Sequence, residues 1–421
     1  MNRNIYVDCT HTYYSLVNTG IQRVVRNIVS SIDTIENVDI IFIRLYHGQY
    51  YPFSQFPPKN TKRNLSHIKS ILRKIYQLSN KIFGSIPYFN AFINSVQLRL
   101  YVNKLLNTLS IKNEQTPKED AIVFNKDDIL LLADATWSNC DYTLLEDAKQ
   151  SGSILIPLIY DIIPITHPEY CQSDLSIAFE AWLKKSFHLF DYYIAISNTV
   201  KNETYSYLKN QLDKNLSIEK FDFFTLGSNF QKKDIEVHSI NDVFKNIFNK
   251  KVFITVSTIE ARKNHIYILK AFELLWKENI DVQYLIIGKI GWKTDAFIEK
   301  VLSHSEYNKR LFMQNDVSDH ELEYAYKHAE ALIFASFVEG FGLPIVESLY
   351  YNLNVLASDI PIHREVGKQN ISYFDLDDPR NLAHIITSAS YIQPIKEINF
   401  TTWKQSSKEL ISKILKLSQK S

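Results

Sequence analysis

The chain has 421 residues, of which 45% are hydrophobic and 22% are charged, and its formal net charge is +1. That length exceeds what one ordinary hydrophobic core fills, so we expect two domains. The 25 Tyr and 25 Phe residues exclude a disordered chain. No apolar run approaches about 18 residues, the length that predicts a membrane-spanning helix.

The cysteines are odd in number and far apart, so they predict neither a disulfide framework nor a metal cluster. Residues 1–8 run straight into a predicted strand and lack the apolar core of a signal peptide. Both features favour a cytoplasmic protein. The cysteines are Cys9, Cys140 and Cys171.

Short apolar runs alternate with amphipathic segments in both halves of the chain, which is typical of parallel sheets with helices on both faces. A polar stretch at residues 231–242 is the expected linker. We therefore predict an α/β fold of two Rossmann-like domains, residues 1–240 and 241–402, with a final helix at residues 403–421. The expected strands are residues 5–7, 40–45, 129–132, 154–159, 192–196 and 221–224, then 252–256, 284–287, 331–334, 355–357 and 372–374.

Residues 40–113 contain no Asp or Glu but eleven basic residues, a segregation that points to a negatively charged partner. Apolar residues at helical spacing alternate there with cations, as in a helix that binds an anionic membrane surface. A packed helical insertion with a solvated basic face fits residues 59–112 equally well, and both interpretations stay open. A nucleic-acid partner is not expected. The apolar positions are Leu65, Ile68, Leu72, Ile75, Leu78 and Ile82, and the interleaved cations are Lys69, Arg73 and Lys81.

The most informative feature is a glycine-rich turn near residue 340, between a buried-strand pattern and a helix that Pro344 opens. At such a turn, free backbone N–H groups and the helix dipole attract an anion. Two carboxylates eight positions apart, Glu339 and Glu347, bracket the turn. Because carboxylates accept hydrogen bonds from sugar hydroxyls, the site favours a ligand that is part phosphate and part sugar, such as a nucleotide sugar.

Residues 339–347, which read EGFGLPIVE, resemble the E-x7-E motif of the retaining glycosyltransferases of family four. The resemblance implies the GT-B fold, in which the two sheets face a central cleft. The first domain then binds the acceptor, the second binds the nucleotide sugar, and the last helix crosses back to the first domain. It also implies that Glu339 contacts hydroxyls of the donor sugar and that Glu347 holds the ribose. The turn residues Gly340, Phe341, Gly342 and Leu343 are expected to line the donor site.

A basic loop at residues 257–265 resembles the VGTxEPRKN loop of the same family. Sugar transfer leaves a nucleoside diphosphate with developing negative charge, which cations can stabilise without a metal. Arg262 offers a planar fork for phosphate oxygens, and Lys263 offers a mobile point charge. Ser257 stands where relatives have glycine and is also expected at the donor.

Further donor contacts follow from shorter resemblances. Gly288 and Lys289 begin a stretch that resembles the GKxGW loop near the nucleotide base, where Trp292 either packs under the base or serves the core or surface. The backbone at Val317 is expected to read the base. Gly20 belongs to a loop that resembles the first loop of the family, where a glycine sits close to the diphosphate.

On the acceptor side, Tyr160 and Asp161 follow a predicted strand and align with a His-Asp pair of the family. Tyr160 replaces the histidine, so no role of that histidine transfers. Asp161 is expected either to orient an acceptor hydroxyl or to form an Asx turn before Pro164. Asp134, Trp137 and Ser197 also lie at predicted strand ends.

No metal or other cofactor is expected. The twelve histidines show no HExxH-type spacing. Residues 375–378 mimic a DxD metal motif, but they directly precede Pro379 and a predicted helix, so a cap is the better interpretation. A GxGxxG sequence is absent, which counts against a dinucleotide dehydrogenase.

The leading interpretation is a retaining glycosyltransferase that moves a sugar from a nucleotide-diphosphate donor to a hydroxyl of a glycan. The EGFGLP turn with the ARKN loop resembles transferases of bacterial O-antigen and capsule assembly, which implies GDP-mannose as donor and a lipid-linked or growing polysaccharide as acceptor. A peripheral position on the inner face of the cell membrane would suit such an acceptor. A nucleotide-sugar epimerase of the same fold and a non-catalytic, membrane-anchored partner subunit remain alternatives.

Overall fold

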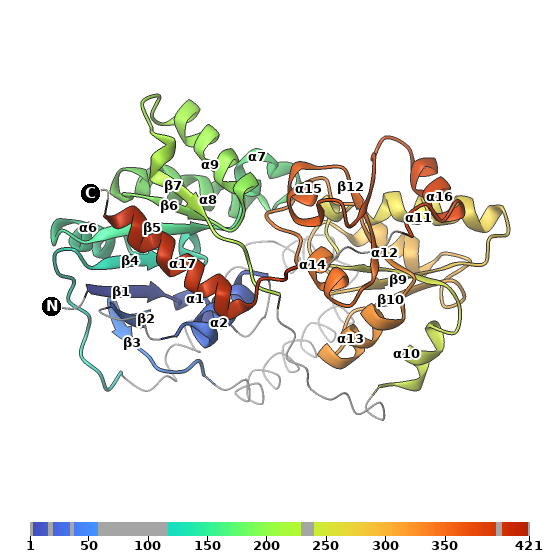
Figure 1. Ribbon diagram of the computed structural model, residues 1–421, viewed down its shortest axis with the longest axis horizontal. Helices are drawn as coiled ribbons and strands as arrows, with labels where there is room; N and C mark the ends of the chain where they lie inside the picture. Colours follow the sequence, from blue (N-terminus) through green and yellow to red (C-terminus); the bar gives the residue numbers. More distant parts are fainter. Residues whose placement is uncertain are drawn as a thin grey trace, which may run out of the picture.

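The computed structural model describes residues 3–15, 20–33, 38–57, 117–228, 240–392 and 398–419. These residues form two sheets with helices packed around each, side by side along the long axis of the molecule (Figure 1). The basic segment at residues 59–112 and most of the expected linker lie outside the described residues.

The first sheet has seven strands in the order β3-β2-β1-β4-β5-β6-β7, all parallel except β3. Its strands are β1 (Arg3–Asp8), β2 (Val38–Tyr46), β3 (Gln49–Pro52), β4 (Ile129–Leu132), β5 (Ile154–Ile159), β6 (Tyr193–Ala195) and β7 (Phe221–Phe223). The α-helices are α1 (Thr10–Tyr14), α2 (Gly20–Ser31), α6 (Tyr142–Gln150), α7 (Ile163–Thr166), α8 (Ser173–Ser186) and α9 (Asn198–Gln211). Short 3₁₀ turns are η2 (Thr136–Ser138), η3 (Pro168–Tyr170), η4 (Phe187–Leu189) and η5 (Ile218–Lys220).

The second sheet has six strands in the order β10-β9-β8-β11-β12-β13, and all of its pairs are parallel. Its strands are β8 (Val252–Val256), β9 (Gln283–Ile287), β10 (Leu311–Gln314), β11 (Ala331–Phe334), β12 (Asn354–Ser358) and β13 (Ser372–Phe374). The helices are α10 (Asp242–Ile247), η7 (Ala261–Lys263), α11 (His265–Lys277), α12 (Asp295–Leu302), α13 (Asp319–His328), α14 (Leu343–Tyr350), α15 (Pro361–Gly367), α16 (Pro379–Thr387) and α17 (Trp403–Ser418).

Both sheets are doubly wound, as the alternation of apolar runs and amphipathic segments predicts. The strand order reverses between β1 and β4 in the first sheet and between β8 and β11 in the second. The inner strands β4 and β11 are apolar and buried at every position, as expected where helices cover both faces of a sheet. Ligands of such sheets bind at the carboxyl ends of the strands, beside the reversal point. The α/β prediction is confirmed.

Two observed strands, β3 and β10, are missing from the sequence prediction. β3 pairs antiparallel with β2 through a two-residue turn at His47 and Gly48, whose φ angles are +47° and +77°. Such hairpin turns favour glycine, so Gly48 was a usable signal. β10 is an edge strand of four residues that shows too little periodicity for recognition.

The last helix, α17, packs against α2 and β7 of the first domain (Figure 1). Its apolar stripe, which includes Leu410 and Ile414, joins the core of the first domain. Thr402 and Gln405 begin the helix with a capping box. Among the described residues, no helix combines the length and apolarity that crossing a bilayer requires.

A methyl group at position 227 tests this docking. In Gly227→Ala, the new Cβ would lie 2.5 Å from Cα of Trp403, the first residue of α17. We expect the overpacking to lower the free energy of unfolding by about 1–3 kcal/mol, measured by urea denaturation. Gly20→Ala is the control, because its Cβ meets nothing within 4 Å. Equal stability of both variants and the wild type would contradict close docking of α17.

Candidate active site between the two sheets

The glycine-rich turn between β11 and α14 lies against the first domain. Gly342 is the N-cap of α14 with φ +95°, a conformation that a side chain disfavours. A Cβ on Gly340 would lie 2.3 Å from the backbone oxygen of Tyr160. The hydroxyl of Ser197, at the start of α9, donates to the backbone oxygen of Gly340 at 3.0 Å. The two glycines therefore permit a close contact that fixes the turn.

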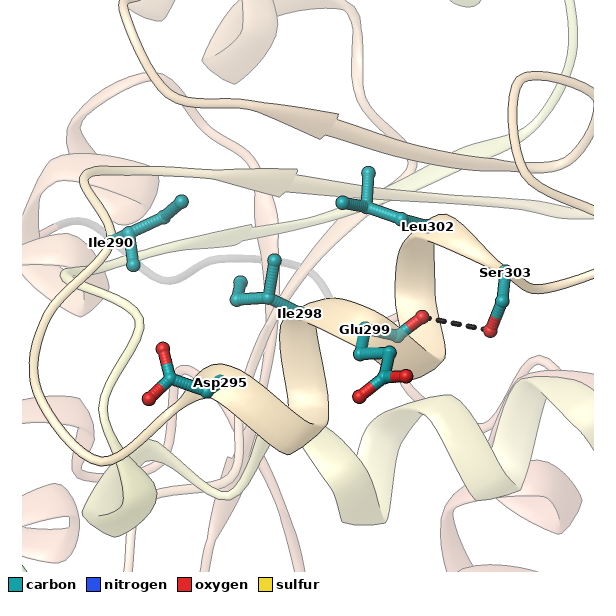
Figure 2. A pocket seen from close by; sticks show the side chains of 6 residues that line it. All are labelled: Ile290, Asp295, Ile298, Glu299, Leu302 and Ser303. Carbon is teal, nitrogen blue, oxygen red and sulfur yellow. Dashed lines mark hydrogen bonds between the residues drawn. The ribbon is translucent and has the colours of Figure 1, made fainter. Parts of the chain in front are cut away.

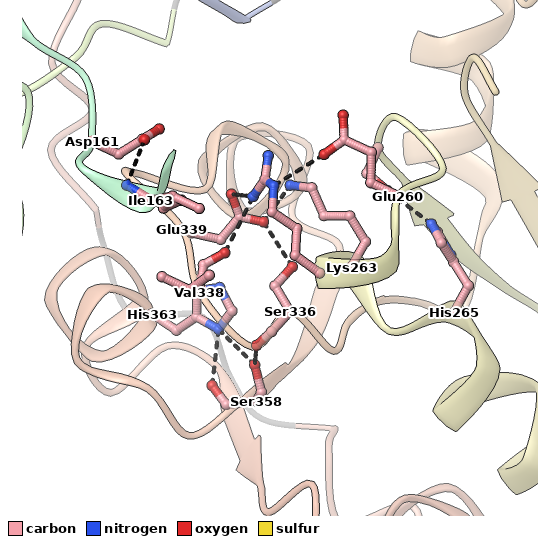
Figure 3. A network of polar contacts seen from close by, with 12 residues as sticks. Asp161, Ile163, Glu260, Lys263, His265, Ser336, Val338, Glu339, Ser358 and His363 are labelled. Carbon is pink, nitrogen blue, oxygen red and sulfur yellow. Dashed lines mark hydrogen bonds and ion pairs between the residues drawn. The ribbon is translucent and has the colours of Figure 1, made fainter. Parts of the chain in front are cut away.

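Glu339 is the centre of a buried ion cluster (Figure 3). Its Oε2 accepts from Nη1 of Arg262 at 2.7 Å. Its Oε1 accepts from the hydroxyl of Ser336 at 2.7 Å and pairs with Nζ of Lys263. Burial alone would raise the pKa of Glu339, but Arg262 and Lys263 hold it well below its usual value. The carboxylate is therefore ionised, and its oxygens are occupied by the two cations and Ser336.

Arg262 and Lys263 come from η7, directly after β8. Nε of Arg262 donates to Glu260 at 3.0 Å, and Nη1 also donates to the backbone oxygen of Val338 at 3.2 Å. Nη2 of Arg262 has no hydrogen-bond partner among the described residues. Burial lowers the pKa of Lys263, with Arg262 adding to the effect, while Glu339 opposes it. The loop thus places the Arg262 guanidinium and the buried Lys263 ammonium beside the Glu339 carboxylate.

Glu347 lies inside α14 and is 3% exposed. Its Oε2 accepts from the phenol of Tyr326, on α13, at 2.7 Å. Its Oε1 forms an ion pair with Nη2 of Arg23, which comes from α2 of the first domain. The sequence prediction gave no role to Tyr326 or to Arg23, although Arg23 belongs to the stretch that resembles the first loop of the family. Arg23 left a signal, because a cation in the first turn of a helix opposes the helix dipole.

The loops after β8 and β9 stack on each other. Gly288 has φ +149°, and a Cβ there would lie 1.8 Å from the backbone oxygen of Ser257. The backbone N–H of Ile259 donates to the backbone oxygen of Lys289 at 2.8 Å, while the side chain of Lys289 is exposed. The hydroxyl of Ser257 lies 3.2 Å from Nε2 of His265 and so is engaged inside the second domain.

The other residues predicted to bind the donor are not members of the ion cluster around Glu339. Gly20 begins α2 in open space, and residues 16–19 before it lie outside the described residues. Val317 is half-buried and directly precedes Ser318, the N-cap of α13. Phe341 and Leu343 pack against the core of the first domain, so only their backbone remains for a donor. The indole N–H of Trp292 donates to the backbone oxygen of Tyr170 at 2.8 Å, which joins the two domains.

Asp161 faces the same ion cluster from the first domain (Figure 3). Its Oδ1 accepts from the backbone N–H of Ile163 at 3.0 Å, which is the Asx turn that one interpretation predicted. Burial raises the pKa of Asp161, and Arg262 opposes that rise. Tyr160 is buried, and its phenol donates to the backbone oxygen of Ala133 at 2.7 Å. Asp378 caps α16, as predicted in place of a metal site.

A separate hollow of about 510 Å³ lies along α12 (Figure 2). It contains none of the predicted site residues. Its lining includes the carboxylates of Asp295 and Glu299, which repel phosphate. The ion cluster around Glu339, and not this hollow, is therefore the candidate for binding a nucleotide sugar.

Acid titration tests the Glu339 cluster. Because the pKa of Glu339 is lowered in the folded protein, the unfolded chain binds its proton first as pH falls through the ordinary value of 4.5. The pairing therefore stabilises the fold above that pH and is lost below it. We expect the free energy of unfolding to fall less steeply between about pH 5 and pH 3 in Glu339→Gln than in the wild type.

The matched control is Glu146→Gln, at an exposed position of α6, which should keep the wild-type slope. Denaturant titrations at each pH provide the measurement. A Glu339→Gln slope equal to that of the wild type would show that the carboxylate is not held ionised by the cluster.

Residues 239–393 match the sequence profile of a family described as Glycosyl transferases group 1. The serotype-specific mannosyltransferase WbdA of Escherichia coli is 31% identical over 312 residues, which is 70% of this chain and 38% of WbdA. The O-antigen chain mannosyltransferase RfbU of Salmonella typhimurium is 25% identical over 238 residues, which is 53% of this chain and 57% of RfbU. The chain thus spans well under half of the length of WbdA.

Two solved structures share the fold over nearly the whole chain. A glycosyltransferase from Rickettsia africae gives a TM-score of 0.53 at 14% identity, covering 100% of this chain and 96% of that one. HepE from Anabaena, in complex with UDP-glucose, gives 0.50 at 11% identity, covering 99% and 97%. Identities this low establish the fold alone. The profile identifies residues 239–393 as a domain of the group 1 glycosyl transferases, and the solved structures show that the chain has their GT-B fold.

Proposed function

We propose that the protein is a retaining glycosyltransferase that moves a sugar, mannose from GDP-mannose, to a hydroxyl of a surface-polysaccharide glycan. The observation that carries the proposal is the buried Glu339 carboxylate between Arg262 and Lys263, at a turn that touches both domains. Two curated relatives, WbdA and RfbU, are named mannosyltransferases, which supports the choice of mannose.

The donor diphosphate would bind where the cations and the start of α14 meet. Nη2 of Arg262 has no partner among the described residues and can donate to a phosphate oxygen. Lys263 can move from Glu339 to the same anion. Both cations then stabilise the negative charge that develops on the leaving diphosphate. Glu339, relieved of its cations, accepts hydrogen bonds from hydroxyls of the donor sugar.

The places of the other site residues in the structure suggest their proposed roles. Glu347 would accept hydrogen bonds from the ribose hydroxyls, and the backbone of residues 340–343 would face the phosphates. Backbone groups at Ser257, Gly288, Lys289, Val317 and Gly20 complete the proposed donor contacts. Asp161, opposite Glu339, would orient the acceptor hydroxyl. That hydroxyl attacks C1 on the face from which the phosphate departs, and its proton passes to the departing phosphate oxygen.

The proposed acceptor is a lipid-linked or growing glycan, which would place the enzyme on the inner face of the cell membrane. The support is the charge of residues 59–112, where cations occur without any Asp or Glu. Anionic lipids attract each basic residue near their surface by about 1 kcal/mol.

A donor panel tests the proposal. The protein is incubated with GDP-mannose, UDP-glucose or a TDP-sugar, together with a mannoside that carries a hydrophobic tag as acceptor. We expect GDP release and a mannosylated product whose anomeric configuration matches that of the donor. Release from UDP-sugars alone would reject mannose. An epimerase would instead return a nucleotide sugar with one inverted ring carbon.

Lys263→Ala is the informative variant for this assay. Loss of one cation from the departing diphosphate should slow transfer by about 30- to 1,000-fold, equivalent to roughly 2–4 kcal/mol of transition-state stabilisation. Lys184→Ala, at a solvent-facing ion pair on α8, should transfer at the wild-type rate. Wild-type rates in Lys263→Ala would remove the central support for the proposal.

A further inference from the structure

Arg23 connects the two domains at the proposed ribose site. It lies three residues after Gly20 in α2, and its side chain is 35% exposed. Its Nη2 pairs with Oε1 of Glu347 in the second domain. On the same helix, Val24, Val25 and Ile28 enter the core of the first domain. The apolar face of the helix packs on its own domain, while Arg23 reaches Glu347 of the second domain.

The position of Arg23 is unfavourable for a purely structural cation. A positive charge in the first turn of a helix is repelled by the helix dipole, and the first turn of α2 contains no acidic residue to offset it. Arg26, one turn later, instead donates to the backbone oxygen of Thr12 at 3.1 Å within its own domain. Arg23 therefore contacts the second domain, whereas Arg26 contacts its own domain.

Both oxygens of Glu347 are already engaged, by the phenol of Tyr326 and by Arg23. A ribose diol at Glu347 must share or replace one of these partners. Burial, followed by the charge of Glu347, raises the pKa of Tyr326 well above its usual value, so the phenol keeps its proton and remains a donor. Tyr326 is also fixed inside α13, whereas Arg23 ends a long, half-exposed side chain. Arg23 is therefore the partner that the ribose can displace.

The charges around the site favour a donor phosphate as the new partner of the displaced Arg23. In the described part of the chain, Asp161, Glu260 and Glu339 interact with Arg262 and Lys263, while Glu347 and Asp319 interact with Arg23, so carboxylates outnumber cations before any donor arrives. A diphosphate adds further negative charge beside them. A guanidinium released from Glu347 gains this new anion as a partner in addition to Asp319, and its planar fork suits phosphate oxygens.

We propose that Arg23 is a third donor-phosphate ligand, supplied by the first domain, which Glu347 holds in the donor-free enzyme and releases to the diphosphate when the ribose binds. This inference rests on the proposed donor site. It makes donor binding depend on both domains, because the exchange requires α2 and α14 to face each other.

Calorimetric titration of Arg23→Gln with GDP and with guanosine tests the inference, and UDP with uridine provides a second pair of probes. We expect the affinity for the diphosphate to fall by about tenfold or more, because one charge-assisted contact is lost. The affinity for the nucleoside should stay equal or increase, because Glu347 is then open to the ribose. Arg23→Lys should recover part of the lost affinity, and Arg26→Gln should bind both probes as the wild type does.

Each other outcome has a defined meaning. If Arg23→Gln binds the diphosphate as tightly as the wild type, or more tightly, Arg23 only competes with the ribose and the inference is wrong. Equal losses for diphosphate and nucleoside, with a lower melting temperature, would show a structural role and also overturn it. If the wild type itself binds none of the diphosphates, the proposed function fails, and this result is distinct from a failure at Arg23 alone.

Discussion

The site depends on one buried carboxylate that is kept ionised by two cations. Removing a charge from water costs several kcal/mol unless close partners and hydrogen bonds compensate. Glu339 obtains these from Arg262, Lys263 and Ser336. An arrangement of this kind is ready to exchange partners, because a phosphate can replace the carboxylate beside the cations and sugar hydroxyls can replace the cations beside the carboxylate. If the proposed donor binds here, the charges needed for transfer are in place before it arrives.

The surrounding structure serves to hold this cluster between the two domains. Glu365, from α15, accepts from the backbone N–H groups of Asn198 and Thr199 at 2.8 Å each, and so caps α9 of the other domain. A carboxylate at a helix N-terminus is favourable both as a cap and toward the dipole. Ser197, next to this cap, bonds the backbone of Gly340. The same helix start therefore fixes the second domain and the turn that carries Glu339.

Local patterns predicted the local structure well. The residues around 340 specified a strand, a turn and a helix, since apolar content, glycine and Pro344 each act within a few positions. The Asx turn at Asp161 and the cap at Asp378 could also be predicted from the sequence, because both depend on neighbouring residues. β3 was missed although its turn carried a glycine, and β10 was missed because a four-residue edge strand leaves little pattern.

Long-range partners could not be read from the chain. The motif placed Glu339 and Glu347 correctly on the turn and in α14, but nothing local indicates that Arg23 meets Glu347 or that Tyr326 donates to it. Likewise, Trp292 was compatible with a place under the base, whereas its indole N–H bonds the backbone of Tyr170 in the other domain. Such contacts depend on how two domains face each other, which no short sequence window encodes.

The most direct measurement is the affinity of Glu339→Gln for a nucleoside diphosphate, compared with its transfer rate. If Glu339 and the diphosphate share the same cations, removing the carboxylate charge releases Arg262 and Lys263 to the phosphates. We therefore expect Glu339→Gln to bind the nucleoside diphosphate at least as tightly as the wild type, yet to transfer sugar about 30- to 1,000-fold more slowly. A parallel loss of diphosphate affinity and transfer, in a variant that keeps the wild-type melting temperature, would contradict this expectation.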